Sequence, residues 1–217
     1  MNPVMWIESD SDGRGTKASF ENIFTFFSGV VGDENGLKYA RRRYEKLREK
    51  SNYILPANSS EFDIIVTLLK TAISNYIIRK PVGTIASCGM IGEIMTKFLF
   101  KVWNEIPQKQ PLTENNQKRL FSDTFEKQFQ QRRINILYEL GIIDSSTKSF
   151  FDKVNEFRND YLHIKKDLMN VDNDAEEIWE NTNKMLEHTL QMKIENKKIW
   201  LNKHIVDYLN IQKKGSR

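Results

Sequence analysis

Glycine and proline, the residues that most often interrupt regular secondary structure, are scarce in this chain. Its 217 residues contain only ten glycines and five prolines, and these fall between long segments in which apolar residues recur every three or four positions. That spacing is typical of amphipathic helices, whereas an all-β chain would show many short alternating segments. The sequence therefore predicts an all-α protein, a bundle of four to five long helices with a short N-terminal helical extension.

Two strongly apolar segments, residues 60–76 and 85–103, predict helices that are buried in the bundle. The second of them carries Gly89 and Gly92, which would let a neighbouring backbone approach it closely. Cys88 lies in the same segment and is expected to be a small core residue rather than a nucleophile.

Three more segments have helical periodicity. One spans residues 121–140 and is ended by Gly141, and another spans residues 150–162 after a capping Asp144 or Ser145. A final long helix, or a broken pair of helices, is expected from residue 174 to residue 210. The apolar residues of the first of these segments are Phe121, Phe125, Phe129, Ile136, Leu137 and Leu140.

The first fifty residues are expected to form the extension (1–50), and residues 51–217 the bundle. Within the extension, residues 20–31 and 37–50 have helical periodicity, and the second segment is highly charged. The second segment contains Arg41, Arg42 and Arg43, flanked by two tyrosines, a pattern that could bind an RNA backbone and stack on its bases. A solvated helix that pairs its arginines with its own glutamates is the alternative.

The net charge of +4 and the isoelectric point near 9.0 permit a nucleic-acid partner but do not require one. A single cysteine excludes an intrachain disulfide and favours a reducing, cytoplasmic location. The start of the chain does not have the pattern of a signal peptide, and the apolar stretch 64–78 is too short and too polar to span a bilayer. A soluble protein with no membrane partner is therefore expected.

The sequence offers no metal site and no nucleotide-binding loop. Its three histidines, His163, His188 and His204, lie far apart without carboxylates at metal-ligand spacing. The glycines near residue 90 lack the lysine and hydroxyl residue of a phosphate-binding loop and follow no strand. No cofactor and no metal are expected.

One segment remains as a candidate site, and it reads Phe157-Arg158-Asn159-Asp160-Tyr161-Leu162-His163. An arginine, a polar residue directly after it, and a histidine five positions after the arginine lie in a late helix of the bundle. In this the chain resembles the HEPN superfamily of helical ribonucleases and RNA-binding domains. Glu93 and Lys97 resemble a Glu-x-x-x-Lys pair found in part of that family, and the resemblance covers roughly residues 60–210.

The resemblance implies a HEPN-like helical bundle that cleaves RNA without a metal ion. Arg158 and His163 would be catalytic, assisted by Asn159, and Glu93, Lys97, Asp160 and Tyr161 would support them. A histidine can exchange a proton near neutral pH, and an arginine can stabilise negative charge on a phosphate. Together they could promote attack of a ribose 2′-hydroxyl on the adjacent phosphate, leaving a 2′,3′-cyclic phosphate and a 5′-hydroxyl.

A separation of five positions turns an ideal helix by roughly 500°, so Arg158 and His163 would project about 140° apart. Family members resolve this by local distortion of the helix and by pairing two copies, which predicts a homodimer with the two motifs face to face. The leading interpretation is thus an endoribonuclease of the toxin or phage-defence type, with RNA as its substrate and a protein inhibitor or antitoxin as a further partner.

Two other functions stay open. A non-catalytic HEPN-like module could bind RNA or a partner protein, and cleavage of labelled RNA in chelator would separate it from the enzyme. A DNA-binding regulator is the weaker alternative, because the sequence has no compact helix-turn-helix pattern.

Overall fold

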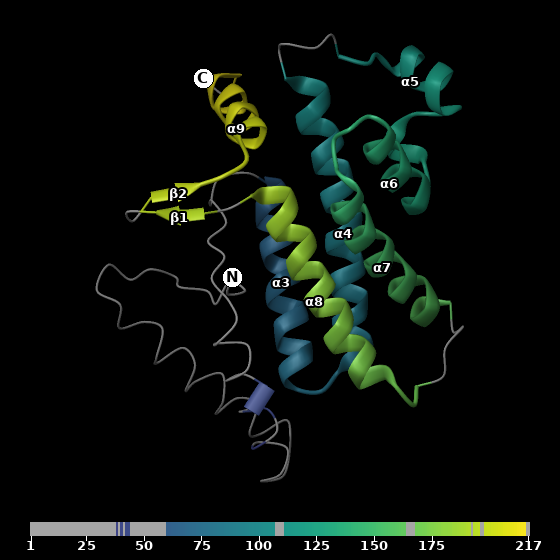
Figure 1. Cartoon of the computed structure of the whole chain (residues 1–217), viewed down its shortest axis with the longest axis vertical. Helices are drawn as coiled ribbons and strands as arrows, with labels where there is room; N and C mark the ends of the chain where they lie inside the picture. The colour runs from purple at the N-terminus through teal and green to yellow at the C-terminus, as the bar shows by residue number, and fades with distance from the viewer. Residues whose placement is uncertain are drawn as a thin grey trace.

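The computed structural model describes residues 38, 40, 42, 43, 60–106, 111–163, 168–191, 193–195 and 198–215. These residues form a predominantly helical bundle with one short hairpin (Figure 1), which confirms the predicted all-α class. In chain order the elements are α3 (Ser60–Ile77), α4 (Pro81–Glu105), α5 (Glu114–Phe121), the 3-10 helix η1 (Phe125–Lys127), α6 (Gln130–Glu139), α7 (Ser145–Leu162), α8 (Val171–Leu190), β1 (Lys193–Glu195), β2 (Lys198–Trp200) and α9 (Lys203–Gly215).

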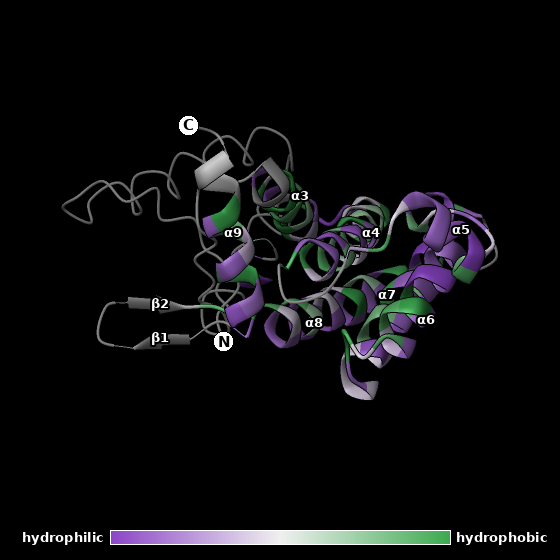
Figure 2. Ribbon diagram, turned by 90° about the horizontal axis from the view of Figure 1, so that it is seen from above, coloured by the Kyte–Doolittle hydropathy of each residue, from purple (hydrophilic) through white to green (hydrophobic). Residues whose placement is uncertain are grey.

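Helix α4 is the centre of the bundle and packs against α3, α6, α7, α8 and α9 (Figure 1). Pro81 occupies its first turn, where a missing N–H costs no hydrogen bond. Its length and hydropathy would suffice for a membrane span, but most of that apolar window is buried inside the protein. The apolar character of α4 is therefore explained by neighbours on nearly every side. Figure 2 shows the hydrophobic residues of the helices in green; α5, at the edge, consists largely of hydrophilic residues.

The predicted helix over residues 121–140 is divided into three pieces, α5, η1 and α6. The division follows from Ser122, whose positive φ of 69° ends α5, and from the extended residues on both sides of η1. Phe121 and Phe125 are buried as their spacing suggests, but Phe129 is 71% exposed. The spacing of Phe129 predicted that it would be buried in the core. That prediction was wrong, because the helix is interrupted before residue 129 and the helical periodicity does not continue through it.

The turn between α6 and α7 agrees with its sequence signals. Gly141 has a φ of +67°, a conformation that glycine adopts without strain, and it follows the end of α6. Asp144 caps α7 by accepting a hydrogen bond of 2.7 Å from the N–H of Thr147. That hydrogen bond lowers the pKa of the Asp144 carboxyl below its usual value. The start of α7, and with it the rotation of the helix, is thereby fixed.

The C-terminal segment is a helix, a hairpin and a second helix rather than one long helix. Helix α8 ends at Gln191, which has a positive φ of 45°, and β1 and β2 then pair antiparallel with Ile194 opposite Ile199. The hairpin returns the chain to the bundle, and Tyr208 of α9 packs edge-on against Phe98 of α4. The alternative of a broken helical pair is thus confirmed.

Four residues of the N-terminal segment are described, and all four are helical. Ala40 and Arg43 are buried, whereas Arg42 is exposed. The helix expected over residues 20–31 lies outside the described residues. The boundary at residue 50 stays a prediction.

Candidate functional site

Arg158 lies in the last turns of α7, and its side chain crosses the surface of α4 at Gly89. A Cβ atom at position 89 would lie only 2.6 Å from Cδ of Arg158, 2.7 Å from its Cγ and 2.8 Å from its Cβ. These distances are far below ordinary van der Waals contact, so only glycine leaves room for the arginine at this crossing. Gly92 accommodates Val154, one turn earlier in α7, in a similar way. Gly89 and Gly92 therefore admit side chains of α7 rather than its backbone.

The guanidinium of Arg158 reaches Glu93 on the next turn of α4. Its Nη2 atom lies 3.4 Å from Oε2 of Glu93, and Nη2 of Arg133 lies 3.0 Å from Oε1. Nζ of Lys97 lies 3.4 Å from the same Oε1. We call Glu93, Lys97, Arg133 and Arg158 the Glu93 cluster. Three helices, α4, α6 and α7, thus bring three cations to one carboxylate.

The cluster carries more positive charge than Glu93 can neutralise. Partial burial opposes ionisation of Glu93, but the hydrogen bond from Arg133 and the charges of Arg133, Lys97 and Arg158 outweigh it and lower the pKa of the carboxyl. Glu93 is therefore ionised at neutral pH, and the four side chains sum to about +2. A second carboxylate, that of the exposed Glu126, also lies near Lys97, with Oε2 of Glu126 3.8 Å from Nζ of Lys97. An excess of positive charge in a partly buried place attracts anions such as phosphate.

Arg133 was not predicted to belong to the site. Its side chain is only 5% exposed, and it holds the face of Glu93 opposite Arg158. No signal in the sequence separates it from its neighbour Arg132, which is half-exposed and pairs with Glu139 at 3.4 Å. Because Arg133 is forty positions from Glu93, only the packing of α6 on α4 brings the two together.

A chain of polar contacts fixes α6 against α7 beside the cluster. The Asn155 amide donates to Oε1 of Gln131 at 3.0 Å, and the Gln131 amide donates to Asp152 at 2.7 Å. Asn155 lies one turn before Arg158 and is buried. These bonds hold the helix of Arg158 in register with the helix of Arg133.

His163 ends α7, and its backbone N–H donates to the carbonyl of Asn159 at 3.1 Å. Its side chain is exposed. Within the described part of the chain, no hydrogen bond or ion pair joins His163 to Arg158 or to Glu93. The structure therefore brings Glu93, Lys97 and Arg158 into direct contact, and His163 is not among the described side chains that contact them.

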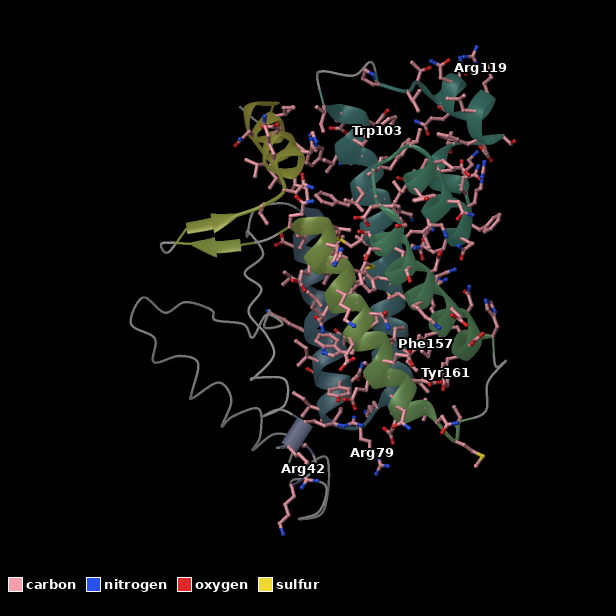
Figure 3. The ribbon with its side chains drawn as sticks, viewed as in Figure 1. Arg42, Arg79, Trp103, Arg119, Phe157 and Tyr161 are labelled. Atoms are coloured by element: carbon pink, nitrogen blue, oxygen red, sulfur yellow. The ribbon has the colours of Figure 1, made fainter. Side chains whose placement is uncertain are left out.

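Tyr161 is buried, and its hydroxyl donates a short hydrogen bond to Asp174 of α8. Figure 3 shows Phe157 and Tyr161 on the C-terminal half of α7, near α8. Tyr161 thereby ties the end of α7, just before His163, to the neighbouring helix. Asn159 and Asp160 are partly exposed between these anchors.

Of the three arginines expected to bind RNA near residue 42, the two that the structure describes, Arg42 and Arg43, do not share one surface. Arg43 is buried; it donates to the Tyr76 carbonyl at 2.6 Å, and its guanidinium lies 3.3 Å from Asp172. Its place in an RNA-binding patch does not fit this geometry, because its charge is used inside the fold. Arg42 is exposed and projects from the end of the bundle (Figure 3), and Arg41 lies outside the described residues.

Two other features lie apart from the cluster. Cys88 is fully buried, and that burial raises the pKa of its thiol to about 12, which confirms it as a core residue. A pocket bounded by Trp103, Ile142 and Ile205 lies at the C-terminal end of α4, far along the helix from Gly89.

Comparison with known proteins adds one finding to this geometry. The family model described as Apea-like HEPN matches residues 39–191, which is well over half of the chain. No curated protein and no solved structure shows a significant match to it. The match includes Glu93, Lys97, Arg133, Arg158 and His163, and the chain belongs to the Apea-like HEPN family.

Proposed function

Because the chain belongs to the Apea-like HEPN family, we propose that it is a metal-independent endoribonuclease of the toxin or phage-defence type, acting in the cytoplasm. The observation that carries the proposal is the Glu93 cluster. It places Arg158 of the Arg-x4-His segment beside two other cations, with 27% of the Arg158 side chain still open to solvent. This is the charge and exposure that a phosphate-binding arginine needs.

Each residue has a part in the proposed reaction. Arg158 binds the scissile phosphate and stabilises the charge that develops as the 2′-hydroxyl attacks phosphorus. His163 accepts the proton of the attacking 2′-hydroxyl, and the departing 5′-oxygen takes up a proton from a second His163, that of the other copy, or from water. Glu93 and Arg133 hold the Arg158 guanidinium, Lys97 adds positive charge, and Asn159 donates a hydrogen bond. The bond to the 5′-oxygen breaks, which leaves a 2′,3′-cyclic phosphate and a 5′-hydroxyl.

We propose further that the active form is a homodimer. Within one copy, no hydrogen bond joins His163 to Arg158 in the described part of the chain, and two copies related by a two-fold axis could pair the histidine of one with the arginine of the other. Three exposed apolar side chains lie at the end of α7 or shortly before α8 in the chain, namely Leu162, Leu168 and Met169. Exposed apolar residues that gather on one surface are typical of an interface. A protein inhibitor that covers the same site is the further partner that a toxin role implies.

The alternative function is a non-catalytic module that binds RNA or a protein. The lack of a hydrogen bond between His163 and the Glu93 cluster in the described part of the chain favours it, because a binding arginine needs no histidine beside it. The charge of the cluster would then serve binding alone.

The deciding experiment incubates pure protein with end-labelled single-stranded RNA in excess chelator. We expect products that end in a cyclic phosphate, and we expect Arg158→Ala and His163→Ala each to abolish them. The matched controls are Arg119→Ala, an exposed arginine on α5 (Figure 3), and His204→Ala, an exposed histidine on α9. Cleavage that survives both site variants would refute the assignment, and RNA binding without cleavage would support the module. Light scattering of the same samples tests the dimer.

A further inference from the structure

Phe129 is the most exposed of the aromatic residues whose side-chain burial the structure describes, with 71% of its surface open to solvent. A phenylalanine in this position buries little apolar area and so contributes little to the fold. It is also the N-cap residue of α6, and it makes no side-chain capping bond. Neither core packing nor helix capping therefore explains its presence.

The backbone around Phe129 is nevertheless held firmly beside the Glu93 cluster. On one side, Glu126 faces Lys97 at 3.8 Å. On the other, Gln130 is buried and contacts Oγ1 of Thr96 at 3.2 Å. The Phe129 carbonyl accepts the backbone N–H groups of Arg132 and Arg133 at 3.0 and 3.1 Å. The backbone at Phe129 is thus held in place by these contacts, while its ring is exposed to solvent.

The residues that flank Phe129 in the chain are charged and polar. Lys127 and Arg132 lie on either side of it, with side chains 67% and 36% exposed, and they form ion pairs with Asp123 at 3.9 Å and Glu139 at 3.4 Å. Glu126, three positions before Phe129, lies 3.8 Å from Lys97 of α4. The core of a protein interface is instead depleted of charge and rich in apolar neighbours. An exposed ring among cations is the arrangement with which proteins bind single-stranded nucleic acid.

We propose that Phe129 is a stacking platform for one base of single-stranded RNA, next to the phosphate held at the Glu93 cluster. The inference rests on the proposed function and adds a binding residue to it. Thr96, which locates the Phe129 segment, is seven positions along α4 from Gly89, where Arg158 crosses. At 1.5 Å per residue that is about 10 Å, so one short stretch of RNA can reach both. Lys127 and Arg132 would contact the phosphates on either side of the stacked base.

The experiment measures the dissociation constant of a labelled single-stranded RNA in a His163→Ala background, so that binding is seen without cleavage. Loss of the stacking of one base raises the dissociation constant for RNA about 5- to 150-fold, and we expect Phe129→Ala to raise it within this range. Phe129→Trp should restore tight binding, whereas Phe129→Leu, which is apolar but not aromatic, should not. Tyr138→Ala is the matched control, because it removes another exposed aromatic residue from the same helix.

The outcomes separate this inference from the proposed function. If the wild-type chain cleaves RNA while Phe129→Ala binds it as tightly as its parent, the platform is refuted and the ribonuclease stands. If the wild-type chain neither binds nor cleaves RNA, both are refuted. Loss of dimers on light scattering of Phe129→Ala would also overturn the inference, since it would assign the ring to a protein contact.

Discussion

The crossing of Arg158 over Gly89 makes a quantitative prediction about Gly89→Ala. The new methyl group would lie 2.6 to 2.8 Å from three carbons of the Arg158 side chain. Because carbon atoms at rest lie about 3.5–4.0 Å apart, the side chain must retreat by about 1 Å. The contact between Arg158 and Glu93 is already 3.4 Å long, so a shift of this size breaks it.

The effects on stability and on activity should differ. Overpacking costs about 1–3 kcal/mol, whereas replacing glycine by alanine inside a helix gains about 1 kcal/mol. The free energy of unfolding should therefore fall by only about 0–2 kcal/mol. A displacement of about 1 Å in a positioned catalytic group can cost about a hundredfold in rate. We expect Gly89→Ala to fold and to lose RNA cleavage to about that extent.

The assay pairs urea unfolding with kcat/KM for RNA cleavage. Gly83→Ala is the control, because it lies in the same helix and its methyl group would meet the flexible amide of Asn75 at 2.7 Å, away from Arg158. It should leave cleavage unchanged. A Gly89→Ala protein with full activity would show that Arg158 does not need its place on α4. An equal loss in both glycine variants would attribute the effect to α4 in general.

Three further predictions follow from the cluster and from α7. Because the folded-state pKa of Glu93 is lowered, its ionised form stabilises the protein above its ordinary pKa of about 4.3, and this stability is lost as the pH falls through the folded value. Urea unfolding between pH 7 and pH 3 should therefore show Glu93→Gln converging on the wild type in acid, and a constant difference would contradict this. Arg133→Met should lower kcat with little change in KM, since Arg133 is buried and contacts Glu93. Steady-state kinetics would show a raised KM with little change in kcat if Arg133 instead contacted RNA. Asp144→Ala should cost about 0.5–2 kcal/mol in urea unfolding through loss of the α7 cap, while cleavage measured well below the melting temperature stays unchanged.

The sequence by itself determined the class of the fold and the helix that carries the arginine. Periodic apolar residues and rare glycines predict helices because the 3.6-residue repeat is a local property of the chain. The helix cap at Asp144 and the turn at Gly141 were also predicted from the sequence, since each depends on a few adjacent residues. Glu93 and Lys97 were identified through their resemblance to the Glu-x-x-x-Lys pair of the family, and their separation of four positions places them on one face of α4, where they form an ion pair.

Only the tertiary structure decided what surrounds the arginine. Arg133 joins Glu93 through the packing of α6 on α4, and Arg43 turns inward to Asp172 of α8, contacts between residues 40 and 129 positions apart. The exposure of Phe129 depends on breaks in a segment whose spacing alone predicted a buried helix. Periodicity states which residues share a face of one helix, whereas burial and charge pairing depend on which helix lies against that face. That choice is made by the packing of the whole bundle, and no short stretch of sequence encodes it.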